Sequence, residues 1–126
     1  MSVRAQILRY CAVGVINTLV SLALDALLLA AGTPLLVASA CAFGAGAATG
    51  YALNRRWTFG AGGSATAGGV YAVVGLCGLA LDSALVHVLH AAALSPLPAF
   101  VVALPIVTLA TFAGNRRFTF RGPAYV

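Results

Sequence analysis

The chain has 126 residues, of which 62% are hydrophobic and only 7% are charged, and its formal net charge is +5. A soluble domain of this size needs many more charged side chains on its surface, so the composition excludes that class and indicates an integral membrane protein. The seven basic residues are all arginines in short clusters, without the lysines and interleaved aromatic residues of a nucleic-acid surface, so no nucleic-acid partner is expected.

Four apolar stretches are each close to the roughly 20 residues that cross a hydrocarbon core of about 30 Å. They predict four transmembrane helices, over residues 10–31, 34–53, 70–91 and 97–114. The first stretch also has the basic flank of a secretory signal peptide, but it is too long for the apolar region of one and it contains Asp25. We therefore expect it to be a helix of the mature domain.

The connections between these stretches predict two helical hairpins. Residues 32–33 and 92–96 are short and contain the glycine and proline that favour tight turns. Residues 60–69 are rich in glycine and have the composition of a flexible linker. The expected fold is a single all-α integral membrane domain over residues 1–126.

One six-residue motif occurs twice, and we call each copy a sextet. Asn54-Arg55-Arg56-Trp57-Thr58-Phe59 returns as Asn115-Arg116-Arg117-Phe118-Thr119-Phe120, at an offset of 115 − 54 = 61 residues, and the same offset carries Tyr10 onto Tyr71. Two motifs with one offset are typical of a tandem duplication. We expect repeat one over residues 9–59 and repeat two over residues 70–120. Because each repeat crosses the membrane twice, the two repeats are expected to be parallel.

The arginines predict the orientation in the membrane. They precede the first expected helix, lie in the central connection or follow the fourth helix, and the hairpin turns have none: Arg4, Arg9, Arg55, Arg56, Arg116, Arg117 and Arg121. The positive-inside rule then places both termini and the central connection in the cytoplasm. The expected location is the inner, cytoplasmic membrane of the cell, crossed several times.

The sextets suit contact with an anionic head group at this boundary. Arginine offers planar, paired donors to phosphate and keeps its charge, while an asparagine at a helix end can cap carbonyls or bind a sugar hydroxyl. The residues predicted to bind phosphate or head group are Arg9, Asn54, Arg55, Arg56, Asn115, Arg116 and Arg117. The aromatic residues expected at the interface are Tyr10, Trp57, Phe59, Tyr71, Phe118 and Phe120. Ordinary anchoring to the phosphates of any membrane lipid is the alternative explanation.

Two acidic residues lie inside the expected helices, where an ionised carboxylate costs about 3 kcal/mol on insertion scales. Asp25 and Asp82 are 57 residues apart, four fewer than the repeat offset, so they could occupy similar helix faces one turn apart. Together with Asn17 they are predicted to line a polar path inside the bundle. Interhelical hydrogen bonds that only hold the bundle together are the alternative.

Glycines predict where helices approach closely. Gly46 and Gly50 lie four residues apart in the second expected helix, and Ala110 and Gly114 form a weaker counterpart in the fourth. These faces are expected to make close contacts within or between protomers. Since four spans of this length enclose little volume, we expect a homo-oligomer.

The sequence has no metal-ligand spacing, no nucleophile paired with a base and no phosphate-binding glycine loop followed by lysine. We therefore expect no catalytic residue, no metal, no cofactor and no enzymatic activity.

From Arg9 to Phe120 the chain resembles the GtrA family of small four-helix membrane proteins. The resemblance rests on Arg9-Tyr10, Val13-Gly14, Asn17-Thr18 and the two sextets, which are its most specific part. It implies a role in polysaccharide or glycolipid assembly at a bacterial-type cytoplasmic membrane, as a flippase for a polyprenyl-phosphate-linked sugar. The second half departs from the pattern, because no arginine matches Arg9 and Gly78 stands where Asn17 would recur.

The leading function is therefore a translocase whose partner is a polyprenyl-phosphate-linked sugar or another anionic lipid. Two alternatives remain. The protein could be a non-transporting accessory subunit that holds a membrane glycosyltransferase, or it could be a small proton-coupled exporter.

Overall fold

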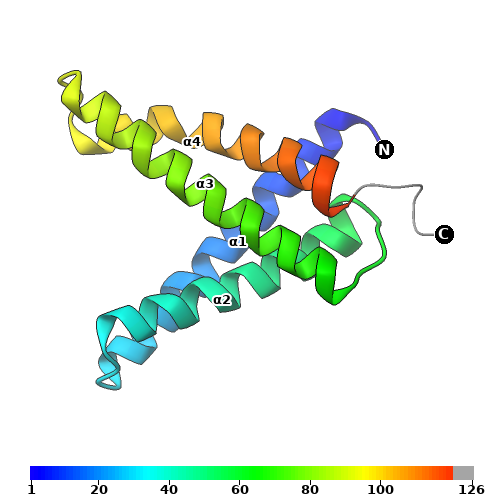
Figure 1. The fold of residues 1–126 in the computed structure, drawn as a ribbon, viewed down its shortest axis with the longest axis horizontal. Helices are drawn as coiled ribbons and strands as arrows, with labels where there is room; N and C mark the ends of the chain where they lie inside the picture. The colour runs from blue at the N-terminus through cyan, green and yellow to red at the C-terminus, as the bar shows by residue number, and fades with distance from the viewer. Residues whose placement is uncertain (121–126) are drawn as a thin grey trace. The chain divides into compact units, whose positions relative to one another are not determined.

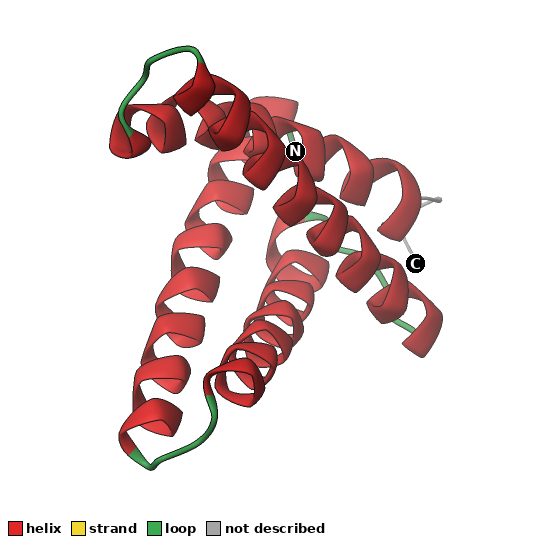
Figure 2. Cartoon of the chain, turned by 60° about the vertical axis from the view of Figure 1, so that its left-hand side comes forward, coloured by secondary structure: helices red, strands yellow, loops and turns green. Residues whose placement is uncertain are grey.

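A computed structural model describes residues 1–120, and this part of the chain forms two helical hairpins (Figures 1 and 2). The long helices are α1 (Val3–Ala30), α2 (Leu35–Leu53), α3 (Ala65–Ala91) and α4 (Pro96–Gly114). Two short π-helices follow α2 and α4 without a break, η1 (Asn54–Thr58) and η2 (Asn115–Thr119). The chain divides into two compact units between Ser64 and Ala65. We call α1, α2 and η1 the first hairpin, and α3, α4 and η2 the second hairpin.

All four long helices have the length and composition to cross a membrane, with a mean hydropathy between 1.4 and 2.0 over their most apolar segments. Many of their large apolar side chains are exposed, for example Leu36 at 83% and Leu8 at 71%. Lipid accepts such surfaces, and a helix satisfies its own backbone groups there. The predicted all-α, four-helix membrane class is confirmed, and the chain is a multi-pass membrane protein.

Two helices begin earlier than the sequence predicted. α1 starts at Val3 rather than at residue 10, because the Ser2 hydroxyl caps its first turn by accepting the Ala5 N–H at 3.2 Å. α3 starts at Ala65 rather than at residue 70, since alanines between the glycines favour helix over linker. With 28 residues, α1 is about 42 Å long, so its N-terminal end extends beyond a hydrocarbon core of about 30 Å.

The two hairpin turns share one geometry at the 61-residue offset. In the first, the Thr33 N–H donates to the Leu28 carbonyl at 2.9 Å, and Gly32 has φ 84°. In the second, the Leu94 N–H donates to the Leu89 carbonyl at 3.1 Å, and Ala93 has φ 73°. This is the closure in which the residue after the helix adopts a left-handed conformation. Glycine adopts it freely, whereas an alanine there is strained by about 1 kcal/mol.

The first hairpin packs through a glycine on α2. A Cβ added to Gly46 would lie 2.6 Å from Asn17 Oδ1 and would overlap Ser21 Oγ, both on α1. Gly46 and Gly50 are buried, as is Ala42 one turn away. The Ser21 hydroxyl donates to the Ala42 carbonyl at 3.1 Å, which joins the two helices. The predicted close approach at Gly46 is therefore present.

In the second hairpin the small residue of the equivalent pair lies on the first helix and the large residue on the second, the reverse of the first hairpin. The position equivalent to Gly46 holds Val107, and the position equivalent to Asn17 holds Gly78. A Cβ added to Gly78 would overlap Thr111 Cγ2 and would lie 3.8 Å from Val107 Cγ1. The small residue thus lies on α3 rather than on α4, and the motif at Ala110 and Gly114 did not predict this contact. A Cβ at Gly114 would still meet Val74 Cγ1 at 3.2 Å, so α4 also approaches α3 there.

Candidate head-group site

The first sextet folds into a wide turn at the end of α2. Asn54 and Thr58 are buried, at 1% and 0% exposure, and the Thr58 hydroxyl donates to Asn54 Oδ1 at 2.7 Å. The Phe59 N–H donates to the Asn54 carbonyl at 2.9 Å and closes the turn. The end of a helix leaves carbonyl groups without partners, and this π-type closure satisfies one of them.

The second sextet repeats the same turn at the end of α4. The Thr119 hydroxyl donates to Asn115 Oδ1 at 2.8 Å, and the Phe120 N–H donates to the Asn115 carbonyl at 2.9 Å. Asn115 and Thr119 are also buried. Because the bonds agree residue by residue, the six-residue motif specifies a local structure and not only a cluster of charges.

An aromatic pair fastens each turn to the first helix of its own hairpin. The rings of Tyr10 and Phe59 meet edge to face, with centroids 6.3 Å apart, and those of Tyr71 and Phe120 do so at 6.1 Å. Such pairs add about 0.5–1.5 kcal/mol beyond the area they bury. Tyr71 and Phe120 are buried, so these predicted interfacial residues lie inside their hairpin.

The turn sorts its six positions into an inner and an outer set. Asparagine, threonine and the last phenylalanine face the hairpin, whereas the arginines and the central aromatic residue lie further out. The residues exposed in this way are Arg56, Trp57, Arg116, Arg117 and Phe118. Of the predicted head-group residues, Arg56, Arg116 and Arg117 are therefore the ones that are exposed to a ligand from outside. The two asparagines use their side-chain oxygens inside the turn, which gives them a structural role.

Arg9 adds a further cation to the first turn. Its Nη1 donates to the Trp57 carbonyl at 2.8 Å, and its Cζ lies 5.3 Å from the centroid of the Trp57 ring. A cation is favourable at the carbonyl end of a helix and above an indole ring. The second hairpin has Val70 at the equivalent position, so it lacks this contact.

Arg55 lies beneath the segment that leaves the first turn. Its Cζ is 5.9 Å from the centroid of the Tyr51 ring, and a Cβ added to Gly63 would overlap its Nη1. The Tyr51 hydroxyl donates to the Ser64 carbonyl at 3.2 Å and accepts the Ser64 N–H at 3.1 Å. These two hydrogen bonds to the backbone of one residue hold the segment over Arg55. The equivalent arginine of the second turn, Arg116, is exposed.

A protein-family model described as GtrA/DPMS, transmembrane domain, matches residues 9–120. The chain belongs to this family. The match begins at Arg9, which contacts the first turn, and ends at Phe120, which closes the second turn. The GtrA/DPMS domain is a membrane domain of glycosyl-lipid and polysaccharide synthesis, which confirms the predicted resemblance and this general role. No curated protein sequence matches the chain.

A polar stripe runs along α1 of this GtrA/DPMS domain. Asn17, Ser21 and Asp25 are four residues apart and so share one helix face. Asn17 and Ser21 contact α2, and the Oδ1 atoms of Asn17 and Asp25 are buried without a hydrogen-bond partner among the described residues. Asp82 lies on α3 at the position equivalent to Ser21. A polar path that includes Asn17, Asp25 and Asp82 would need residues of both hairpins, and this path stays a prediction.

Some residues of this GtrA/DPMS domain that shape the site escaped the sequence analysis. Thr58 and Thr119 recur in both sextets, so the repetition itself was a signal for them. Tyr51 and Gly63 act on Arg55 through a turn that no sequence pattern marks. Residues 1–120 contain no group of three histidine, cysteine or acidic side chains that could hold a metal ion.

Proposed function

We propose that this GtrA/DPMS domain moves a polyprenyl-phosphate-linked sugar from the inner to the outer leaflet, for cell-surface polysaccharide or glycolipid synthesis. The observation that carries the proposal is the doubled turn, in which a buried Asn–Thr bond and an aromatic pair hold a pair of arginines at the end of each hairpin. Rigid support of this kind lowers the entropy lost when side chains bind a ligand.

In this mechanism the arginines recruit the phosphate at the cytoplasmic side of the inner membrane. Guanidinium groups form paired, charge-assisted hydrogen bonds to phosphate. The sequence has only two acids, and both lie well inside α1 and α3, so the positive charge at the turns is available to an anion. Asn54 and Asn115 then contribute by fixing the turns.

The sugar would cross along the polar residues while the lipid chain stays in the bilayer. The buried Oδ1 atoms of Asn17 and Asp25 are acceptors that sugar hydroxyls could satisfy in place of water. Asp82 would extend this route in the second hairpin. Movement across a membrane forms no new bond, so we propose neither a catalytic residue nor a cofactor, and a homo-oligomer would supply the volume that a sugar needs.

The test is transport by purified protein in liposomes. A radiolabelled polyprenyl-phosphate hexose is placed in one leaflet, and its accessibility to an enzyme or reagent in the other is followed. We expect Arg55→Gln with Arg56→Gln to slow transport by at least about tenfold, since one lost charged hydrogen bond is worth about 1.5–3 kcal/mol. The same is expected for Arg116→Gln with Arg117→Gln.

Arg4→Gln is the matched control, because Arg4 is exposed on α1 outside both turns. It should leave the rate unchanged. Normal transport by both double variants, with insertion verified, would remove the phosphate assignment.

An accessory subunit for a membrane glycosyltransferase is the second candidate. Gly14 and Gly44 have no neighbouring atom within 4 Å of an added Cβ, so they leave small-residue surfaces free for another helix. In this case the purified protein alone would move no labelled lipid, and it would copurify with a glycosyltransferase through α1 and α2.

A further inference from the structure

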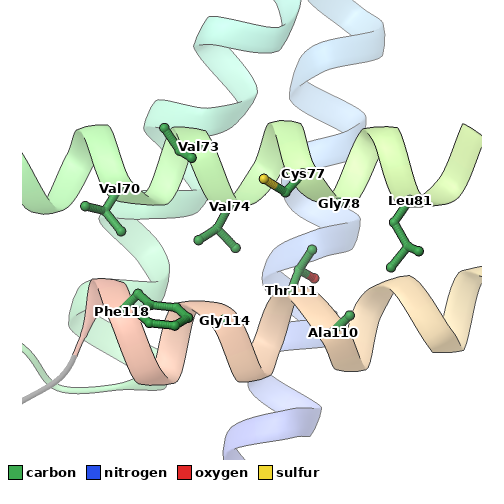
Figure 3. A pocket seen from close by; sticks show the side chains of 10 residues that line it. All are labelled: Val70, Val73, Val74, Cys77, Gly78, Leu81, Ala110, Thr111, Gly114 and Phe118. Carbon is green, nitrogen blue, oxygen red and sulfur yellow. The ribbon is translucent and has the colours of Figure 1, made fainter.

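The second hairpin contains an apolar groove between α3 and α4 (Figure 3). Its volume is about 500 Å³, and it extends along α3 from Val70 to Leu81. Val74 and Leu81 point into it from α3, and Phe118 closes the end next to the second turn (Figure 3). The one hydroxyl on its wall belongs to Thr111 and already donates to the Val107 carbonyl at 2.9 Å. The groove therefore offers an occupant almost only hydrocarbon.

Two glycines border this groove. These are Gly78 and Gly114, and the equivalent positions in the first hairpin hold Asn17 and Leu53. The Asn17 side chain reaches α2 at Gly46, so it fills the corresponding space in the first hairpin. The residues that border the groove at these two positions are thus particular to the second hairpin.

The end of the groove at Phe118 lies next to the exposed arginines of η2. The Arg117 Cζ lies 5.7 Å from the centroid of the Phe118 ring, and Phe118 lines the groove. Arg116 is exposed beside it. A ligand that fits this arrangement has an apolar chain with an anion at one end.

The dimensions select the kind of chain. From Val70 to Leu81 is 81 − 70 = 11 residues, or about 16 Å of helix, so 500 Å³ spread over this length gives a mean cross-section of about 30 Å². A helix about 10 Å across has a cross-section of about 80 Å². A groove of this section admits a single hydrocarbon chain along its length, whereas a packed helix would reach into it only with side chains.

We propose that this groove binds the chain of a polyprenyl phosphate, whose phosphate group meets Arg116 and Arg117. The inference rests on the proposed function and adds to it the site that holds the lipid chain. The two hairpins then differ in role, because the first provides Asn17 and Asp25 for the sugar, whereas the second provides the groove for the chain in addition to Asp82.

The experiment uses the full chain in lipid bilayers with a polyprenyl phosphate that carries a diazirine several isoprene units from the phosphate. After photolysis, mass spectrometry locates the adducts. Cys77 lines the groove, and its equivalent in the first hairpin is Ile16, which is likewise exposed. Because a carbene reacts more readily with a thiol than with an aliphatic side chain, the comparison is made in the Ile16→Cys variant, and we expect severalfold more label at Cys77 than at residue 16. A diazirine-bearing polyprenol without phosphate should lose most of this preference.

Two variants sharpen the result. Ala110→Phe fills the groove from α4 and should abolish the preference for Cys77. Ala113→Phe, at an exposed position of the same helix that does not line the groove, should retain it. Equal label at Cys77 and residue 16 in the Ile16→Cys protein would overturn the proposal, whether bilayer lipid, the first hairpin or a second copy occupies the groove.

Transport measured on the same samples separates this inference from the proposed function. Normal transport with equal labelling removes the groove and leaves the translocase. Preferential labelling of Cys77 without transport keeps the groove and removes the translocase.

Discussion

The two hairpins agree at their ends and differ in their interiors. Both have the Asn–Thr bond and the tyrosine–phenylalanine pair at one end, and both have the left-handed residue in the turn at the other. Between these ends, the first hairpin pairs Asn17 with Gly46, whereas the second pairs Gly78 with Val107. Arg9 also contacts the first turn, where the second hairpin has Val70.

This difference teaches which part of the duplicated unit is general and which is specialised. The ends must meet the membrane boundary in both copies, and one rigid turn serves both. The interiors differ, because the first hairpin has a polar stripe on α1 and the second has an apolar groove between α3 and α4. Close packing makes the reversed order of small and large residues workable, since a large residue fits only where its partner is small.

The largest change in unfolding free energy is expected when the large residue of the second hairpin is introduced into the first without the matching small one. Gly46→Val places a Cβ where it overlaps Ser21 Oγ and lies 2.6 Å from Asn17 Oδ1. Overpacking of this kind costs about 3 kcal/mol of unfolding free energy, which can be measured in detergent micelles. Gly44→Val is the control, because no atom lies within 4 Å of its added Cβ, and it should change the free energy by less than about 0.5 kcal/mol.

A double variant tests whether size is the cause. Asn17→Gly with Gly46→Val copies the arrangement of Gly78 and Val107 into the first hairpin. We expect a coupling energy of about 1–2 kcal/mol in the double-mutant cycle, in which the helix penalty of the new glycine cancels. Strictly additive losses would show that Ser21, which the double variant keeps, and not Asn17 limits the size of residue 46.

A smaller and equal effect is expected in the two turns. Thr58→Val and Thr119→Val each remove a donor from a buried asparagine Oδ1 while they keep the side-chain shape. Each should cost about 2 kcal/mol of unfolding free energy. Thr58→Ser, which keeps the hydroxyl, should cost less. Losses that differ between the two turns by more than about 1 kcal/mol would contradict their equivalence.

Sequence patterns predicted the ends of the hairpins better than their interiors. Hydrophobic runs predicted the membrane spans, and the repetition at an offset of 61 residues predicted the sextets. A turn of this kind depends on residues that are adjacent in the sequence, so a sequence motif can specify it. The reversed order of small and large residues involves residues about 30 apart on neighbouring helices, for example Asn17 and Gly46, and depends on which faces meet. The bond between Tyr51 and the Ser64 backbone likewise depends on the path of the connection and left no trace in composition.

Opposite substitutions in the two hairpin turns are expected to change the unfolding free energy in opposite directions. Gly32→Ala puts a Cβ into the left-handed conformation and should cost about 1 kcal/mol of unfolding free energy. Ala93→Gly relieves the same strain and should stabilise by about 0.5 kcal/mol, because the greater freedom of the unfolded glycine offsets part of the gain. Changes of the same sign would mean that the two turns do not share their geometry. Thermal unfolding of both variants beside the unchanged protein measures this.

The smallest effect on stability is expected at the segment over Arg55, which has no equivalent at Arg116. Tyr51→Phe removes both hydrogen bonds to Ser64 but keeps the ring against which Arg55 lies. These bonds are exposed, so global unfolding should change by only about 0.5 kcal/mol. Local opening should become easier by about 1 kcal/mol, which raises the rate of trypsin cleavage after Arg56 about fivefold.

Ser64→Ala is the control that removes the side-chain hydroxyl of residue 64 while the Tyr51 hydroxyl stays in place. Both bonds end on the backbone of residue 64, so this variant keeps them and should leave the cleavage rate unchanged. If Tyr51→Phe also left the rate unchanged, the two bonds would not hold the segment in place. Arg55 would then be covered through other contacts of the segment, such as that of Gly63 with its Nη1, and its difference from the exposed Arg116 would remain.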